Sequence, residues 1–208
     1  MKSKGSKFCS IAALTIVIMQ IVVVLMSWLI NSANGSSTAV RSLLSAEGIR
    51  WFFGHFADNL ATPYLVWIIL VAIAFGSVKY SGIISPLRSM LTKKKVLSFR
   101  ERIALYVVFA ELIGAVFIML LLTIIPHAIL LSVSGSLFPS SFSESMIPLI
   151  AFVCTFLSLS FGTMSGNLHG IKNILDTMTE GIYEARYILL LYVLFVQLLF
   201  FIIFVFNF

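Results

Sequence analysis

The stretch Tyr187-Ile-Leu-Leu-Leu-Tyr-Val-Leu-Phe-Val-Gln-Leu-Leu-Phe-Phe-Ile-Ile-Phe-Val-Phe206 contains a single side chain, Gln197, that is neither aliphatic nor aromatic. A helix rises about 1.5 Å per residue, so this run matches the ~30 Å hydrocarbon core of a bilayer. No water is present there to bond the backbone, and a helix satisfies its own polar groups. The stretch therefore predicts a transmembrane α-helix.

Four further apolar stretches of similar length precede it, at residues 8–30, 64–84, 103–125 and 146–164. Of the 208 residues, 60% are hydrophobic and 11% are charged, and the mean hydropathy is +1.09. A soluble domain carries about 25% charged residues, so this composition cannot cover a surface exposed to water. The sequence predicts an all-α, polytopic transmembrane helix bundle with five crossings, forming one transmembrane domain over residues 1–208.

Basic residues lie mainly on one side of the predicted crossings. Twelve of the fourteen Lys and Arg residues lie on this side: eleven precede the first crossing or lie between the second and third or the fourth and fifth, and Lys79 lies in the last turns of the second crossing. Only Arg41 and Arg50 lie on the other side. Positive residues are enriched in cytoplasmic connections. We expect the N-terminus in the cytoplasm and the C-terminus outside. We also expect the basic residues behind the net charge of +6 to contact anionic lipid headgroups and not nucleic acid. The first stretch is too long for a signal peptide, whose apolar core has about 7–15 residues, and is expected to be retained.

The connections between crossings differ in character. Residues 37–62, on the outer side, are predicted to hold an interfacial helical segment with Trp51 at headgroup depth, because apolar residues recur there at rough helical spacing among charged ones. Residues 86–102 read as a short basic loop. Pro126 is expected to interrupt the third crossing near its outer end, and Ser132–Ser145 to form a second outer loop.

A few polar side chains fall inside the predicted crossings. Glu111 lies about two turns into the third, Thr155 and Ser158 lie in the fourth, and Gln197 lies in the fifth. Counting about 1.5 Å per residue from the cytoplasmic ends places all four at similar depth, which allows one intramembrane polar layer. An intramembrane carboxyl is costly and suggests function by default. Two roles stay open: helix packing, which is favoured, and relay of a proton or cation.

Small residues recur every four positions in the fourth crossing, at Cys154, Ser158, Gly162 and Gly166, which predicts close approach of another helix. No enzyme pattern is visible. The histidines lie in different connections or helix ends, without metal-ligand spacing, a nucleophile motif or a phosphate-binding glycine loop. We therefore expect no catalytic residue, no cofactor and no metal site.

The string from Ser42 to Phe52, with the sequence SLLSAEGIRWF, is the most specific pattern in the chain. Two longer series of residues accompany it. One continues through Pro63, Val71, Gly76 and Ser81-Gly82-Ile83, and the other runs from Ser98-Phe99-Arg100 through Pro148-Leu149-Ile150, Ser160-Phe161-Gly162 and Met178-Thr179-Glu180 to Val196-Gln197. Together they resemble the AbgT (p-aminobenzoyl-glutamate transporter) family over most of the chain.

This resemblance implies a protein of the bacterial inner membrane. Family members are more than twice this length, and their two re-entrant hairpins would lie where this chain has only Leu87–Leu97 and beyond the helix of Gln197. Transporters built from inverted repeats form their sites from such elements. We expect a shortened relative that does not transport alone or, alternatively, a membrane scaffold or binding subunit that retains the framework helices. The expected partners are the lipid bilayer and a second copy or membrane protein that supplies the missing transporter elements.

Overall fold

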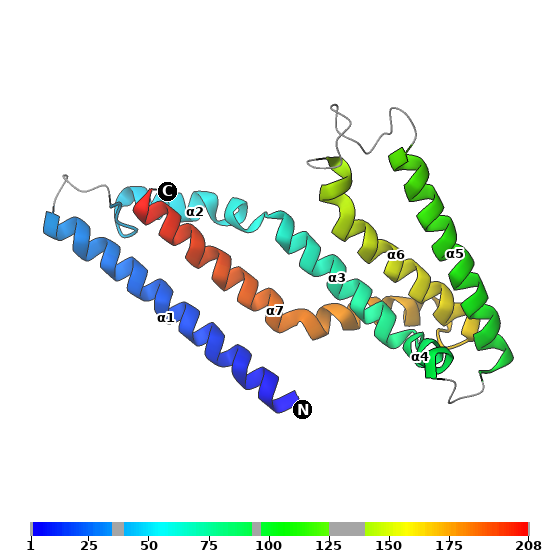
Figure 1. Cartoon of the computed structure of the whole chain (residues 1–208). Coiled ribbons are helices and arrows are strands. Elements are labelled where there is room, and N and C mark those ends of the chain that lie inside the picture. The colour runs from blue at the N-terminus through cyan, green and yellow to red at the C-terminus, as the bar shows by residue number, and fades with distance from the viewer. Residues whose placement is uncertain (1, 35–39, 93–96, 125–139, 208) are drawn as a thin grey trace. The chain divides into compact units, whose positions relative to one another are not determined.

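The structure is a computed structural model that describes residues 2–34, 40–92, 97–124 and 140–207. These residues form seven α-helices and no strand (Figure 1): α1 (Lys2–Asn34), α2 (Ala46–Leu60), α3 (Pro63–Tyr80), α4 (Ile84–Thr92), α5 (Phe99–Ile124), α6 (Ser141–Ser165) and α7 (Gly170–Phe206). Five of them, α1, α3, α5, α6 and α7, are long and apolar enough to cross a bilayer. The predicted all-α polytopic bundle with five crossings is confirmed.

The chain divides into two compact units. The terminal unit contains Met1–Val66 and Arg186–Phe208, and the central unit contains Trp67–Ala185. Helices α3 and α7 have residues in both units. The single domain over residues 1–208 stays a prediction.

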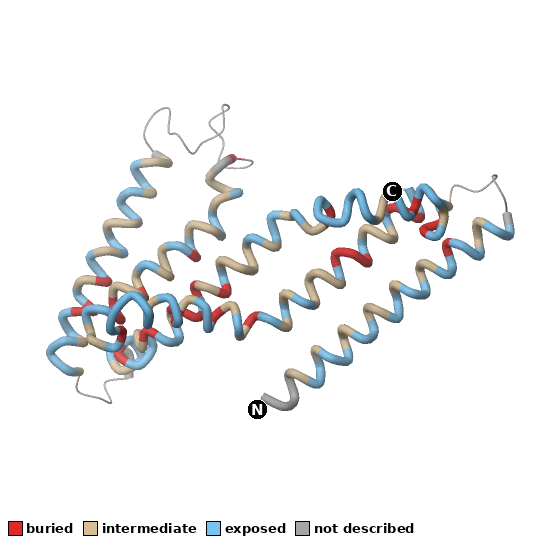
Figure 2. Tube along the Cα trace, turned by 180° about the vertical axis from the view of Figure 1, so that it is seen from behind, coloured by how far each residue is buried: buried red, intermediate tan, exposed pale blue. Residues whose placement is uncertain are grey.

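In the terminal unit, the non-helical segment that precedes α2 is held by α1 and by the last turn of α7. The backbone N–H of Arg41 donates to the carbonyl oxygen of Val205 at 3.0 Å, and the N–H of Leu43 donates to Ser27 Oγ at 3.2 Å. Leu43 forms a buried cluster with Phe204 and Val205, packed against Val23, Val24, Val40, Trp51 and Phe201. The buried positions of this segment and of the end of α7 are red in Figure 2.

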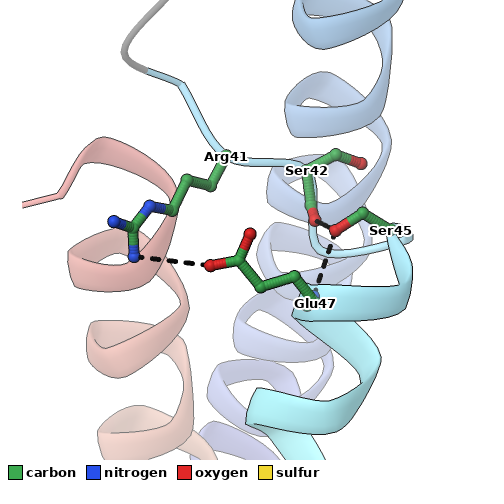
Figure 3. A network of polar contacts seen from close by, with 5 residues as sticks. Arg41, Ser42, Ser45 and Glu47 are labelled. Atoms are coloured by element: carbon green, nitrogen blue, oxygen red, sulfur yellow. Dashed lines mark hydrogen bonds and ion pairs between the residues drawn. The ribbon is translucent and has the colours of Figure 1, made fainter.

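Polar contacts stabilise the N-terminal end of α2 (Figure 3). Ser45 is the N-cap: its Oγ accepts from the N–H of Gly48 at 3.1 Å and donates to the carbonyl oxygen of Ser42 at 2.7 Å. Such a cap satisfies a backbone donor that has no partner within the helix. Trp51, expected at headgroup depth, stacks on Phe204 with ring centroids 4.4 Å apart, so it contributes to packing against α7. The interfacial position of this segment stays a prediction.

In the central unit, α5 and α6 pack on each other through a buried cluster of Ala104, Leu105, Val108 and Phe161. Helix α6 begins with a capping box between Ser140 and Ser143 and ends at Gly166, whose φ of 80° is left-handed. Glycine adopts this conformation without a steric penalty, which makes it a frequent helix terminator.

Several helix bounds differ from the prediction. The expected loop at 86–102 is wrong for its first part, because Pro86 lies in the first turn of α4. A proline is tolerated there because its missing N–H would have no partner within the helix. Helix α7 has 37 residues, since the polar residues before Tyr187 continue the same helix. The predictions for Pro126 and for the outer loop up to residue 139 lie outside the described residues.

Candidate functional site

Glu111 lies on the side of α5 that faces α6. The hydroxyl of Ser160 donates to Glu111 Oε1 at 2.7 Å. Glu111 Oε2 is buried and has no hydrogen-bond partner among the described residues. The hydrogen bond between Ser160 and Glu111 lies one turn along α5 from Val108, whose side chain belongs to the buried α5–α6 cluster. A carboxyl held in this way joins the two helices by a polar link inside an otherwise apolar interface.

The other predicted layer residues of α6 bond within their own helix. Thr155 Oγ1 donates to the carbonyl oxygen of Ala151 at 2.8 Å, and Ser158 Oγ donates to that of Cys154 at 2.6 Å. Hydroxyls that are bonded in this way need no partner on another helix. Ser158 is buried, but neither residue is the partner of Glu111.

Ser160 is the site residue that the depth count missed. That count took the cytoplasmic ends of the third and fourth crossings to lie level. In the structure Glu111 lies twelve residues after Phe99, where α5 begins, whereas Ser160 lies five residues before Ser165, where α6 ends. The first turns of α5 therefore extend beyond the end of α6. The charged residues Arg100, Glu101 and Arg102 in those turns were the available signal.

Gln197 belongs to the terminal unit, whereas Glu111, Thr155 and Ser158 belong to the central unit. The Gln197 side chain is 5% exposed, and neither its Oε1 nor its Nε2 has a partner among the described residues. The intramembrane layer of all four residues stays a prediction.

Two cavities in the central unit are lined by apolar side chains. One, of about 540 Å³, lies between α5 and α6 and is bordered by residues that include Leu112, Ala115, Met119, Val153 and Leu157. The other, of about 330 Å³, lies between α3 and α6. Cys154 borders both, and neither is lined by a charged side chain. Such cavities suit hydrocarbon or aromatic groups, because an unpaired charge is very costly in an apolar environment.

The predicted small-residue stripe on α6 is only partly a packing surface. Gly162 meets the Leu168 side chain and Ser81, where an added Cβ would lie 2.5 Å from Leu168 Cδ1. Gly166 instead terminates the helix, so its assignment to the stripe is wrong.

Two glycines bring the backbones of α3 and α7 close together in the central unit. An added Cβ on Gly76 would lie 2.5 Å from Gly181 Cα, and one on Gly181 would lie 2.1 Å from the carbonyl oxygen of Ala72. Small residues recur every four positions on both helices, at Ala72 and Gly76 and at Thr177, Gly181 and Ala185. This spacing was visible in the sequence. It was missed because Thr177, Gly181 and Ala185 lie before the predicted crossing at residues 187–206.

A polar contact lies one turn from this glycine pair. Lys79 forms an ion pair with Glu184, and the hydroxyl of Tyr80 donates to Glu184 Oε1 at 2.7 Å. The end of α3 is thus joined to α7 by both close packing and charge. Among the described residues, no group of three or more His, Cys, Asp or Glu side chains is placed to hold a metal ion.

No protein-family model matches the chain, and no curated protein sequence matches it significantly. Among solved structures, the crystal structure of the YdaH transporter of Alcanivorax borkumensis matches with a TM-score of 0.72 and 12% sequence identity. The match covers 91% of this chain and 70% of that chain. YdaH belongs to the AbgT family. Because identity is low, the likeness concerns the fold alone: the chain has a helical membrane-protein fold similar to that of YdaH.

Proposed function

We propose that this chain is an AbgT-type, transporter-like protein of the bacterial inner membrane that does not move p-aminobenzoyl-glutamate by itself. The observation that carries the first part is the fold shared with YdaH over 91% of the chain. The second part rests on the chemistry of the cavities and on the sequence, in which we expect a shortened member of the family.

A p-aminobenzoyl-glutamate anion carries two carboxylates, and each needs oriented donors or cations away from water. The two cavities described above, one between α5 and α6 and one between α3 and α6, are lined by apolar residues. Nearby, Glu111 is itself acidic, and the hydroxyls of Thr155 and Ser158 are bonded to their own helix. These residues complement an apolar group better than a dianion. On this proposal the donors come from a second copy or from another membrane protein.

The test is uptake of radiolabelled p-aminobenzoyl-glutamate into vesicles that contain only the purified protein, under sodium and proton gradients. We expect no accumulation above that in empty vesicles. A proton-driven transporter of known activity, reconstituted in parallel, verifies that the gradients hold. Saturable, gradient-driven accumulation by the protein alone would contradict the proposal.

The scaffold or binding-subunit alternative makes a different prediction. Purification in native lipid patches should then recover a second membrane protein in a fixed ratio, and adding that protein to the vesicles should not produce uptake. Uptake that appears only with the partner favours the two-part transporter.

For orientation, we propose a cytoplasmic N-terminus and an outer C-terminus, from the distribution of Lys and Arg. Cys9 and Cys154 are first replaced by Ala, because both are free thiols. A cysteine at Ser134 should then react with an impermeant maleimide in intact cells, and one at Lys94 should react only after permeabilisation. The reverse pattern would invert the topology.

A further inference from the structure

The two apolar cavities of the central unit lie side by side along α6. Ile150 and Cys154 border both the α5–α6 cavity and the α3–α6 cavity, so a single ridge of α6 separates them. On α3 the lining residues recur at helical spacing and form one stripe: Val71, Ala74, Phe75 and Val78. The two cavities therefore share the same level of the helix over the turn from Ile150 to Cys154.

Close packing shuts both cavities toward the end of α6. Leu157 borders the α5–α6 cavity and also packs against the buried cluster that contains Leu105 and Phe161. On the other side of α6, two turns after Cys154, Gly162 meets the end of α3: an added Cβ would lie 3.3 Å from Ser81 Cβ. The way into each cavity thus lies toward the beginning of α6, where α5 and α6 separate (Figure 1).

The rims of the cavities face hydrocarbon. Val116 on α5, Ile150 on α6 and Phe75 on α3 are 51%, 51% and 54% exposed. All three helices are long and apolar enough to cross a bilayer, so apolar side chains exposed along them meet lipid. The atoms that line an unfilled cavity lack contact partners on one side. Groups that come from the bilayer can supply those contacts.

The dimensions of the cavities fit acyl chains. The α5–α6 cavity reaches from Leu112 to Thr123, which is about 16 Å at about 1.5 Å per residue. Half of the hydrocarbon core is about 15 Å thick. The α3–α6 cavity reaches from Val71 to Val78, about 10 Å on the same measure. A helix about 10 Å wide would need more than about 1,200 Å³ over 16 Å. The larger cavity has about 540 Å³, so it cannot take a helix of a second copy.

We propose that one two-chain phospholipid straddles α6, with one acyl chain in the α5–α6 cavity and the other in the α3–α6 cavity. Ile150 and Cys154 lie between the chains, and the headgroup lies toward the beginning of α6, because both cavities are closed at the other end. In the described part of the chain, neither cavity is lined by a charged residue, so the acyl chains make the contacts. Linking two chains makes the binding of the second intramolecular, which favours this lipid over single chains.

The test is photolabelling of the whole protein by two probes. One is phosphatidylethanolamine with a diazirine in the middle of one acyl chain, and the other is the corresponding single-chain lysophosphatidylethanolamine. Labelling is done in vesicles and again after a detergent wash that exchanges loosely held lipid, and labelled residues are identified by peptide mass spectrometry. Met119 reports the α5–α6 cavity, and Val78 reports the α3–α6 cavity. Leu121, which is exposed on the opposite side of α5 from Met119, reports lipid outside the cavities.

Before the wash, we expect the two-chain probe to label all three positions. After the wash, this probe should remain at Met119 and Val78 and be lost from Leu121. It should leave at least about ten times more label in the cavities than the single-chain probe, since linkage of two binding groups raises avidity by about 100-fold or more.

A substitution in one cavity should affect both. Ala115→Leu places a larger side chain in the α5–α6 cavity and should lower the label at Met119 by about tenfold. The label at Val78 should fall with it, because both chains belong to one molecule. Ala110→Leu, the same change on the exposed side of α5 away from the cavity, should leave both labels unchanged. The comparison of the two probes on the unaltered protein does not depend on how well these variants fold.

Four results would overturn the proposal. Equal retention of both probes would mean that single chains bind separately, and so would a loss at Met119 in Ala115→Leu that leaves Val78 unchanged. Loss of label from all three positions on washing would mean that the cavities hold only loose bilayer lipid. Labelling of Leu121 in vesicles without labelling of Met119 and Val78 would mean that protein covers the cavities.

Discussion

The terminal unit and the central unit are each stabilised internally by a different kind of contact. In the terminal unit a non-helical segment enters the packed region, and its backbone groups are bonded to helices, as in the contacts of Arg41 with Val205 and of Leu43 with Ser27. In the central unit helices pack on helices, and Gly76 and Gly181 bring the backbones of α3 and α7 close together. A helix satisfies its own backbone, so small side chains suffice where two helices meet, whereas a loop needs donors and acceptors from its neighbours.

The largest effect should come from the glycine crossing of the central unit. Gly181→Ala would place a Cβ 2.1 Å from the backbone oxygen of Ala72, which cannot move without displacing α3. We expect a loss of about 3 kcal/mol or more, read as a fall in the unfolding temperature in detergent. Gly114→Ala is the matched control, because nothing lies within 4 Å of its Cβ position. Equal stability of the two variants would show that the crossing is not tightly packed.

A smaller loss is expected where the loop of the terminal unit meets α2. A Cβ on Gly48 would lie 2.6 Å from the carbonyl oxygens of Ser42 and Leu43, but that segment is short and non-helical and can shift. Gly48→Ala should therefore cost about 2 kcal/mol in the same thermal assay. Gly54→Ala, on the same helix with open space around it, should be neutral or slightly stabilising. A larger loss for Gly48→Ala than for Gly181→Ala would reverse the comparison between the units.

The polar link of the central unit should have an intermediate effect that depends on both partners. Ser160→Ala leaves Glu111 Oε1 without its donor, and we expect a loss of about 1–2 kcal/mol. In the background of Glu111→Leu the same serine change should cost almost nothing, which gives a coupling energy of about 1–2 kcal/mol. Thr155→Ala serves as a control that should show no coupling to Glu111. Strictly additive effects of Ser160→Ala and Glu111→Leu would show that the hydrogen bond does not stabilise the pair.

The smallest effect should come from the ion pair at the start of α2. Arg41 and Glu47 are 3.8 Å apart, and their side chains are 47% and 69% exposed. Pairs at such exposure contribute little, so Glu47→Gln should change stability by less than about 0.5 kcal/mol. A loss comparable to that of Gly48→Ala would mean that charge, and not backbone contact, holds this segment.

The crossings were predictable because a bilayer imposes a length and a composition on any helix that spans it. Runs such as residues 187–206 satisfy both requirements with almost no polar residue. Helix α4 was not predictable in this way: it is nine residues long and contains a proline, and both features favour a loop in the sequence.

Contacts between helices were harder to predict, because they depend on how far each helix extends past its apolar run. Glu111 lies within α5, one of the helices long and apolar enough to cross a bilayer, and its partner Ser160 depends on the extra turn of α5 that begins at Phe99. Gly181 lies in the polar first part of α7, which composition separates from the crossing although the helix is continuous. Contacts with α3, at Gly181 and through the Lys79–Glu184 ion pair, stabilise this part of α7, because glycine, threonine and asparagine are weak helix formers.

The terminal unit is assembled from the two ends of the chain, and this has a consequence for biosynthesis. Residues 1–66 leave the ribosome well before residues 186–208 exist, and synthesis proceeds at about 5–20 residues per second. During that interval the backbone N–H of Arg41 lacks its acceptor on Val205, and the Gln20 amide lacks the carbonyl oxygen of Leu194, to which it donates at 2.8 Å in the finished protein. Until α7 is synthesised, the Gln20 amide on α1 therefore faces lipid or the insertion machinery instead of its acceptor on α7. A ribosome that stalls before α7 is complete leaves a nascent chain whose Gln20 amide has no partner on α7, and an unpaired amide in the bilayer costs free energy.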